Sequence, residues 1–201
     1  GYSDPSYVVD HQTGTIFNFH VKSYDQGWGG SKAGTDPENR SIIQAEVSTS
    51  TDNGWTWTHR TITADITKDK PWTARFAASG QGIQIQHGAH AGRLVQQYTI
   101  RTAGGAVQAV SVYSDDHGKT WQAGTPIGTG MDENKVVELS DGRLLLNSRT
   151  QGTAGQRLEA ISYDGGQTWG PFRHNWDLTD PRNNASIIRA YPNAPQGSAR
   201  A

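Results

Sequence analysis

Short stretches in which apolar and polar residues alternate recur along the chain, separated by turns that contain glycine. Three of them are rich in β-branched residues and run directly into a turn, at residues 41–50, 106–114 and 157–163. Upstream of each lies a second alternating segment with a glycine at its centre, Gly14, Gly92 or Gly142. Alternation with a period of two is typical of half-buried strands, and a glycine between two such runs favours a hairpin. The pattern predicts a turn-rich, all-β chain.

The turn after each of these three strands carries the same eight-residue pattern, Ser-x-Asp-x-Gly-x-Thr-Trp. The copies lie at residues 50–57, 114–121 and 162–169. The Asp side chain can accept hydrogen bonds from amides later in the turn, the Gly allows positive φ, the Ser and Thr hydroxyls can close the same turn, and the Trp can pack beneath it. One copy would be weak evidence, because Asp-x-Gly turns are common. Three copies indicate a repeated supersecondary unit.

Each unit is expected to contain four antiparallel strands, a to d in chain order, with the repeated turn between c and d. The short polar segment 58–66 is the expected strand d of the first unit. Such units of about fifty residues are the blades of a β-propeller, in which strand a lies nearest the central axis. We expect complete blades over residues 1–70, 71–127 and 128–178.

Residues 179–201 are expected to begin a fourth blade, with its strand a at residues 183–191. Propellers contain roughly four to eight blades, so three and a fraction cannot close a ring. The chain is therefore expected to be an interior part of a single, larger propeller domain.

The first unit is longer than its sister units between strands b and c. From the turn glycine to the serine of the repeated turn it spans 36 residues (14 to 50), against 22 (92 to 114) and 20 (142 to 162). The inserted region, residues 21–40, is rich in Gly, Asp and Pro, which favours a loop. In an up-and-down sheet, the a–b and c–d turns lie at one end and the b–c and d–a connections at the other. The long loop is therefore expected at the end opposite to the repeated turns, and that end is free for function.

Polar and aromatic residues at the start of strand a or the end of strand b should point to this free end, near the axis. They are Asp4, Arg75, Phe76, Asp132, Glu133 and Arg149. Glu133 and Asp132 precede Arg149 by 16 and 17 positions. A guanidinium that meets carboxylates near the axis suits an anionic substrate.

The repeated pattern resembles the Asp box of sialidases. The segment "DENKVVELSDGRLLLNSRT", residues 132–150, resembles the sialidase segment that carries a catalytic glutamate and one arginine of a three-arginine cluster. Residues 3–19, "SDPSYVVDHQTGTIFNF", and 88–95, "GAHAGRLV", also resemble bacterial secreted sialidases. The resemblance covers essentially the whole chain. It implies a six-bladed propeller in a secreted, extracellular exo-α-sialidase that removes terminal sialic acid from glycoconjugates with retention.

The resemblance also implies roles for individual residues. Glu133 would hydrogen-bond the nucleophilic tyrosine and act as its base, and Arg149 would bind the carboxylate of sialic acid. Other residues expected in the sugar pocket are Asp4, Asp132, Phe76 and Trp28. Phe76 would contact the N-acetyl or glycerol part of the sugar, and Trp28, on the long loop, would form a wall of the site. For these four, ligand contact and an ordinary structural role both remain open.

Some parts of the family's active site are expected outside this chain. The first arginine and the aspartic general acid should precede position 1, and the third arginine and the nucleophilic tyrosine should follow position 201. No tyrosine of the chain stands in the context of the nucleophile. The 201 residues alone are not expected to be a working catalyst.

Composition excludes several other classes of function. Lys plus Arg number 18 and Asp plus Glu 19, so no broad electrostatic field favours nucleic acid or an anionic membrane surface. No apolar run of 18 residues suggests a membrane span. Without cysteine, disulfides, thiolate zinc sites and a cysteine nucleophile are excluded, although the compartment stays open. The "HGAH" motif at residues 87–90 lacks a ligand cluster, and neither a metal nor a cofactor is expected.

The expected partners are sialylated glycans, and the complete protein is expected to be a monomer. Two other interpretations remain open. The first is a non-catalytic Asp-box propeller that binds glycans or proteins. The second is an isolated fragment whose exposed blade edges pair or aggregate.

Overall fold

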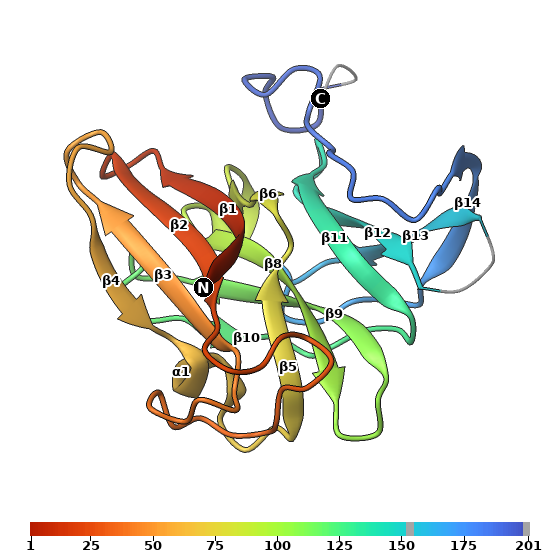
Figure 1. Ribbon diagram of the computed structural model, residues 1–201. Helices are drawn as coiled ribbons and strands as arrows, with labels where there is room; N and C mark the ends of the chain where they lie inside the picture. The colour runs from red at the N-terminus through yellow and green to blue at the C-terminus, as the bar shows by residue number, and fades with distance from the viewer. Residues whose placement is uncertain (152–154, 199–201) are drawn as a thin grey trace.

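The computed structural model describes residues 1–151 and 155–198, which fold into three mainly antiparallel sheets (Figure 1). The strands are β1 (Tyr2–Asp10), β2 (Thr15–Lys22), β3 (Gln44–Ser50), β4 (Thr58–Thr61), β5 (Trp72–Ala77), β6 (Gly80–Gln81), β7 (Ile83–Gln84), β8 (Leu94–Thr102), β9 (Val107–Ser114), β10 (Gln122–Ala123), β11 (Met131–Glu138), β12 (Leu144–Thr150), β13 (Gln156–Ser162) and β14 (Arg173–Thr179). A short helix, α1 (Thr63–Thr67), and a 3-10 turn, η1 (Gly88–His90), complete the elements.

Each sheet has the up-and-down order expected of the repeated unit. The first sheet has the order β4-β3-β2-β1-β6, the second β10-β9-β8-β5 with β7 also paired to β8, and the third β11-β12-β13-β14. The insertion of the first unit is a loop between β2 and β3, as the sequence predicts. No helix in the described part of the chain has the length and apolar character needed to cross a membrane.

The three repeated turns share one pattern of hydrogen bonds. In the first, Ser50 Oγ donates to Asp52 Oδ1 over 2.8 Å and accepts from the Gly54 amide over 2.9 Å, and the Thr56 amide donates to Asp52 Oδ1 over 2.9 Å. The same bonds recur around Asp116 and Asp164. The Thr56 bonds and the Ser50 bond lower the pKa of Asp52 to about 2. Each turn therefore satisfies its own polar groups, which supports a structural role.

Apolar side chains fill the space between neighbouring sheets. Phe17 and Phe19 of β2 pack edge-on against Trp121, the tryptophan of the second repeated turn, with ring centroids 5.5 and 4.8 Å apart. A second cluster joins Met131 and Leu146 of the third sheet to Ala109 of β9. The tryptophan of a repeated turn thus acts as a wedge between two sheets.

The innermost strand of the second sheet is interrupted. After β5 the chain leaves its sheet, and β6 pairs in parallel with Ser6 and Tyr7 of β1 before β7 returns to β8. Gly82 lies at the return, where a Cβ atom would approach the Val95 carbonyl oxygen to within 2.2 Å, so only glycine fits. This excursion joins the inner edges of the first two sheets.

The expected strand d at residues 58–66 is only partly correct. β4 ends at Thr61, and α1 follows because the chain turns to bury Ile62 and Ile66 in the core shared by the first two sheets. The Thr63 hydroxyl accepts a hydrogen bond from the Ala45 amide over 2.9 Å. If β4 continued, this amide would instead pair with the β4 backbone.

The strand expected at residues 183–191 is not formed, which corrects the prediction for that segment. The segment runs irregularly past β11, held by Lys135 Nζ, which donates to Asn184 Oδ1 over 2.9 Å. Within the described residues no strand pairs with it, and a strand needs a neighbour for its backbone donors and acceptors. Residues 199–201, the end of the expected fourth blade, lie outside the described residues.

Asp10 closes the β1–β2 turn and joins it to the second sheet. Its buried carboxylate accepts from the Gln12 amide, from Thr13 Oγ1 and from Gln84 Nε2, and lies 2.7 Å from His117 Nδ1. Burial alone would raise the pKa of Asp10, but these bonds outweigh it and lower the pKa to about 2.

We expect Asp10 to contribute to acid sensitivity. Its folded pKa lies below the unfolded value of about 3.9, so its stabilisation is present above that pH and is lost as the pH falls toward about 2. Asp10→Asn should lower the free energy of unfolding at neutral pH by about 1–2 kcal/mol and flatten its decline at acid pH. Urea denaturation across this range measures both effects, with exposed Asp69→Asn as control. An unchanged acid decline would contradict the assignment.

Candidate active site

All three innermost strands are irregular near their first residues, at the end of the molecule opposite to the repeated turns. The register shifts between Ser3 and Ser6 in β1, between Trp72 and Ala74 in β5, and between Met131 and Asn134 in β11. β-Bulges of this kind re-aim side chains and are common next to active sites. The free end predicted from connectivity therefore carries three bulges as well as the long loop.

The bulge in β11 brings Asp132 and Glu133 to the same guanidinium. Met131 pairs with Thr150 and Asn134 with Ser148, so Asp132 and Glu133 together oppose Arg149. Arg149 Nη1 donates to Glu133 Oε2 over 2.6 Å, and Arg149 Nη2 lies 3.3 Å from Asp132 Oδ2. In a regular strand, consecutive side chains point to opposite faces, so the bulge is what allows both carboxylates to reach Arg149.

The three charges are partly open to solvent. The side chain of Arg149 is 27% exposed, that of Glu133 18% and that of Asp132 8%. Burial alone would lower the pKa of Arg149, but the Glu133 hydrogen bond and the nearby charges of Asp132 and Glu133 outweigh it and raise the pKa. Gln151 Nε2 also donates to Asp132 Oδ2 over 3.0 Å. The guanidinium of Arg149 is thus held between the carboxylates of Asp132 and Glu133 at the free end of the sheet.

The backbone of this bulge is held by the neighbouring strands. The Asp132 carbonyl oxygen accepts from Thr99 Oγ1 of β8 over 3.0 Å, from Asn134 Nδ2 over 2.8 Å and from Ser148 Oγ over 3.4 Å. Asn134 is fully buried and also donates to the Tyr98 carbonyl over 3.2 Å. The second sheet therefore fixes where the carboxylates of the third sheet point.

Asn134→Ala is expected to loosen the bulge. It removes the donor to the Asp132 and Tyr98 carbonyls, and buried acceptors that lose a partner cost about 1–3 kcal/mol. The free energy of unfolding from urea titration should fall by that amount, whereas exposed Asn193→Ala should leave it within about 0.5 kcal/mol. Equal stability of Asn134→Ala and the parent protein would show that the bulge does not depend on this side chain.

Asp4 occupies the β1 bulge with a strained backbone, since its φ is 56°. Its carboxylate accepts from Ser3 Oγ over 2.7 Å and from Ser79 Oγ over 3.1 Å. The Ser79 carbonyl accepts from Asn184 Nδ2 over 2.9 Å, and Asn184 in turn accepts from Lys135. Hydrogen bonds therefore connect the Asp4 bulge to β11 of the third sheet.

Lys135 is a buried cation of this end that our sequence analysis missed. It follows Glu133 by two positions on the innermost strand, and that period-two spacing was the available signal. Burial lowers its pKa to about 8, although the charge of Glu133 opposes the shift. Arg157 was also missed. It lies on β13, 3.7 Å from Asp180, and its Nε donates to Asn147 Oδ1 over 2.8 Å.

Trp28 and Phe76 lie together at the base of the long loop. Their rings meet edge-on with centroids 5.1 Å apart, and both pack against Val21, Ile43 and Ala74. The Arg101 guanidinium lies over the Trp28 ring, 5.5 Å from its centroid. Both aromatic side chains stay partly exposed, so packing and ligand contact are compatible at each.

Arg75, in contrast, is fully enclosed. It donates to the carbonyls of Ile43 and Trp72 over 3.3 and 2.6 Å, and burial lowers its pKa to about 10. It therefore braces the end of the long loop against β5, and its buried side chain is not available to a ligand.

The structure thus brings Asp132, Glu133 and Arg149 into one cluster and Trp28 and Phe76 into another, with Asp4 on a separate bulge. In the described ranges, the single group of three His, Asp or Glu ligand atoms close enough to share a metal ion lies elsewhere, on the first sheet. The free end therefore offers two kinds of chemistry: the positioned carboxylate of Glu133 can accept a proton, and the guanidinium of Arg149 can bind an anion.

Comparisons with known proteins show which family this chain is similar to. The sequence profile of the BNR repeat-like domain matches residues 3–197. A sialidase of Micromonospora viridifaciens is 66% identical over 201 residues, which is 100% of this chain and 31% of that protein. A sialidase of Bacteroides fragilis (strain YCH46) is 30% identical over 173 residues, covering 84% of this chain and 30% of that protein.

Among solved structures, the Hadza microbial sialidase Hz136 superposes with a TM-score of 0.81 at 28% identity. The match covers 94% of this chain and 36% of that one. The shared architecture confirms the prediction of an all-β chain built from β-propeller blades. The chain spans about a third of the length of these relatives.

Proposed function

The chain belongs to the family of BNR repeat-like domains, and on that premise we propose that the whole protein is an exo-α-sialidase. It would release terminal sialic acid from glycoconjugates with retention of configuration. The observation that carries the proposal is the cluster of Glu133, Asp132 and Arg149 on the β11 bulge. The similarity of the entire chain to a named sialidase supports it.

In this proposal Arg149 binds the carboxylate of the sugar. Its planar guanidinium carries five N–H donors and stays charged, so it can hold Glu133 and a second carboxylate together. Its Nε is shielded from solvent and has no acceptor in the described structure. A bound sugar carboxylate would supply the missing acceptor.

Glu133 would act as the base for a tyrosine that another part of the protein supplies. The tyrosine oxygen attacks the anomeric carbon while the glycosidic C–O bond breaks, and Glu133 accepts the phenolic proton. A neutral nucleophile avoids the approach of a second anion to a sugar that already carries a carboxylate. A general acid from outside this chain protonates the leaving oxygen, and water later cleaves the tyrosyl–sugar bond.

The remaining candidate residues complete the pocket in this proposal. Asp4 and Asp132 accept hydrogen bonds from sugar hydroxyls, Phe76 contacts the N-acetyl or glycerol part, and Trp28 of the long loop forms a wall of the site. We also propose that the whole protein is secreted, acts as a monomer and meets sialylated glycans outside the cell, where such substrates are displayed.

Release of free sialic acid tests this function directly. The whole protein is incubated with a sialylated oligosaccharide, and free sialic acid is measured together with binding of the intact glycan. Release with multiple turnovers supports the enzyme. Saturable binding without release would overturn it in favour of a non-catalytic propeller that binds glycans.

A further inference from the structure

The long loop between β2 and β3 meets the second sheet beside the candidate active site. It carries Trp28, whose ring packs edge-on against Phe76 of β5. In Figure 1 this loop lies at the bottom of the view, where β5 begins. Both sides of the contact, the long loop and the second sheet, lie within this chain. The position of Trp28 can therefore be traced to contacts that the chain itself contains.

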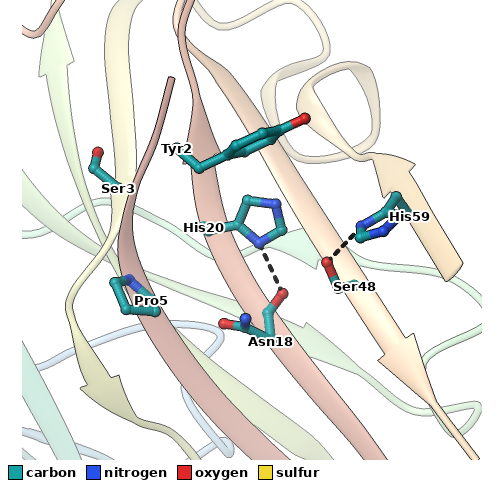
Figure 2. Close-up of a pocket in the computed structure, with 7 residues that line it drawn as sticks. All are labelled: Tyr2, Ser3, Pro5, Asn18, His20, Ser48 and His59. Carbon is teal, nitrogen blue, oxygen red and sulfur yellow. Dashed lines mark hydrogen bonds between the residues drawn. The ribbon is translucent and has the colours of Figure 1, made fainter. Parts of the chain in front are cut away.

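The outer face of the first sheet differs in this respect. Figure 2 shows His20 and His59 on this face, with the Tyr2 ring beside His20. Blades of a propeller pack face to face around the axis, so the preceding blade of a larger propeller is expected to cover these side chains. The open pocket beside them therefore does not indicate a ligand site.

The base of the long loop is fixed by bonds between its two arms and by one bond to the second sheet. Arg40 donates to Asp25 twice, from Nη2 over 2.6 Å and from Nε over 2.9 Å. The buried Ser31 Oγ accepts from the Ile43 amide over 3.1 Å. The Ile43 carbonyl accepts from Arg75, as described above. The central part of the loop needs an attachment of its own.

Arg101, the last residue but one of β8, supplies that attachment. Its Nη1 donates to the Gly29 carbonyl over 3.2 Å, and its Nη2 donates to the Ser31 carbonyl over 3.1 Å. The same guanidinium lies over the Trp28 ring, 5.5 Å from the centroid, which is a favourable cation–π contact. One side chain thus contacts the ring of Trp28 and the backbone that follows it.

The bulge in β5 fixes Arg101 in turn. Thr73 is the extra residue of this bulge, because Trp72 pairs with Thr102 and Ala74 pairs with Arg101. Thr73 Oγ1 accepts from Arg101 Nε over 2.9 Å and lies 3.3 Å from the Arg101 carbonyl oxygen, to which it can donate. A planar guanidinium whose Nε is held presents its two Nη groups in a set direction. The bulge therefore directs Arg101 at the loop.

We propose that Arg101 is a positioning residue, which holds Trp28 in place as a wall of the sugar pocket. It acts through the loop backbone and the Trp28 ring and does not itself touch the sugar. The proposal rests on the proposed sialidase function, in which Trp28 forms part of the site. Without Arg101, the central part of the loop loses both backbone bonds to β8, and the wall moves. Glu133 and Arg149 lie on the third sheet and keep their geometry, so binding should weaken while the chemical step is preserved.

Steady-state kinetics of the whole protein measure this difference. Arg101→Gln should raise KM for a sialylated oligosaccharide about 5- to 20-fold, as expected for the loss of one or two hydrogen bonds, while kcat stays within about twofold. Arg101→Lys keeps a cation near the ring but not both backbone bonds, so its KM should lie between those of Arg101→Gln and the parent protein. The matched control, exposed Lys119→Gln in the second repeated turn, should change neither quantity.

Coupling between the two residues separates positioning from general stability. In a Trp28→Ala background, Arg101→Gln should change KM by less than about twofold, because the ring that Arg101 positions is absent. Equal effects of Arg101→Gln on KM in both backgrounds would overturn the proposal. So would a lower unfolding temperature with KM unchanged.

Limited digestion with trypsin reports the loop independently of activity. Lys32 and Arg40 are exposed cleavage sites in the long loop, and cleavage at both should be at least about fivefold faster in Arg101→Gln but not in Lys119→Gln. Unchanged cleavage would overturn the attachment of the loop by Arg101, whatever the activity. Absence of sialic acid release by the parent protein would instead overturn the proposed function, and with it the role of Trp28 toward the sugar.

Discussion

Replacing Arg149 with alanine is expected to lower kcat/KM for sialoside hydrolysis by the whole protein by about three orders of magnitude. Removal of one partner from a largely desolvated, hydrogen-bonded charge pair costs about 2–5 kcal/mol. Here it removes the donor to Glu133 and the counter-charge of Asp132 as well as the group proposed to hold the sugar carboxylate. Both kcat and KM should therefore worsen.

Arg149→Lys distinguishes charge from geometry. Lysine keeps one positive charge but cannot hold two carboxylates with a planar fork, so this variant should recover only part of the lost activity. Arg143→Ala is the matched control, because Arg143 lies in the β11–β12 turn at the opposite end and pairs with Asp141. Steady-state kinetics supply the test, and thermal unfolding checks that each variant is folded. Wild-type KM and kcat in Arg149→Ala would contradict the proposed role.

Replacing Glu133 with glutamine is expected to lower kcat by about 100- to 10,000-fold, the usual contribution of a general base. Glutamine has nearly the same shape, and its side-chain oxygen can still accept from Arg149. It cannot take the proton from the tyrosine. KM and the affinity for a non-hydrolysable sialic acid analogue should therefore change by less than about threefold, since the groups that bind the sugar remain in place.

Kinetics and ligand titration of the same preparation separate the two quantities. Asp141→Asn, in the β11–β12 turn at the opposite end of the molecule, is the control for loss of an exposed carboxylate away from the cluster. If Glu133→Gln turned over substrate within about twofold of the parent protein, Glu133 would not be the base. If it lost affinity instead of turnover, Glu133 would belong to the binding surface, and Asp132 would become the next candidate to test.

Much of the fold could be predicted because its signals are local. The alternation that predicts β2, β3, β8, β9 and β12 reflects which side chains face a sheet neighbour, and each repeated turn satisfies its own hydrogen bonds within eight residues. Where the outcome depended on a distant partner, prediction failed. Residues 183–191 resemble a strand but pair with no strand in the described structure, and Thr63–Thr67 form a helical turn because Ile62 and Ile66 are buried in the core.

The candidate site shows the same division. The sequence by itself determined the residue types, the strands that carry them and the end of the molecule at which Asp4, Glu133 and Arg149 lie. Only the tertiary structure decided that Asp132 and Glu133 meet one guanidinium, because a bulge is a mismatch between two strands and is held here by Thr99 of a neighbouring sheet.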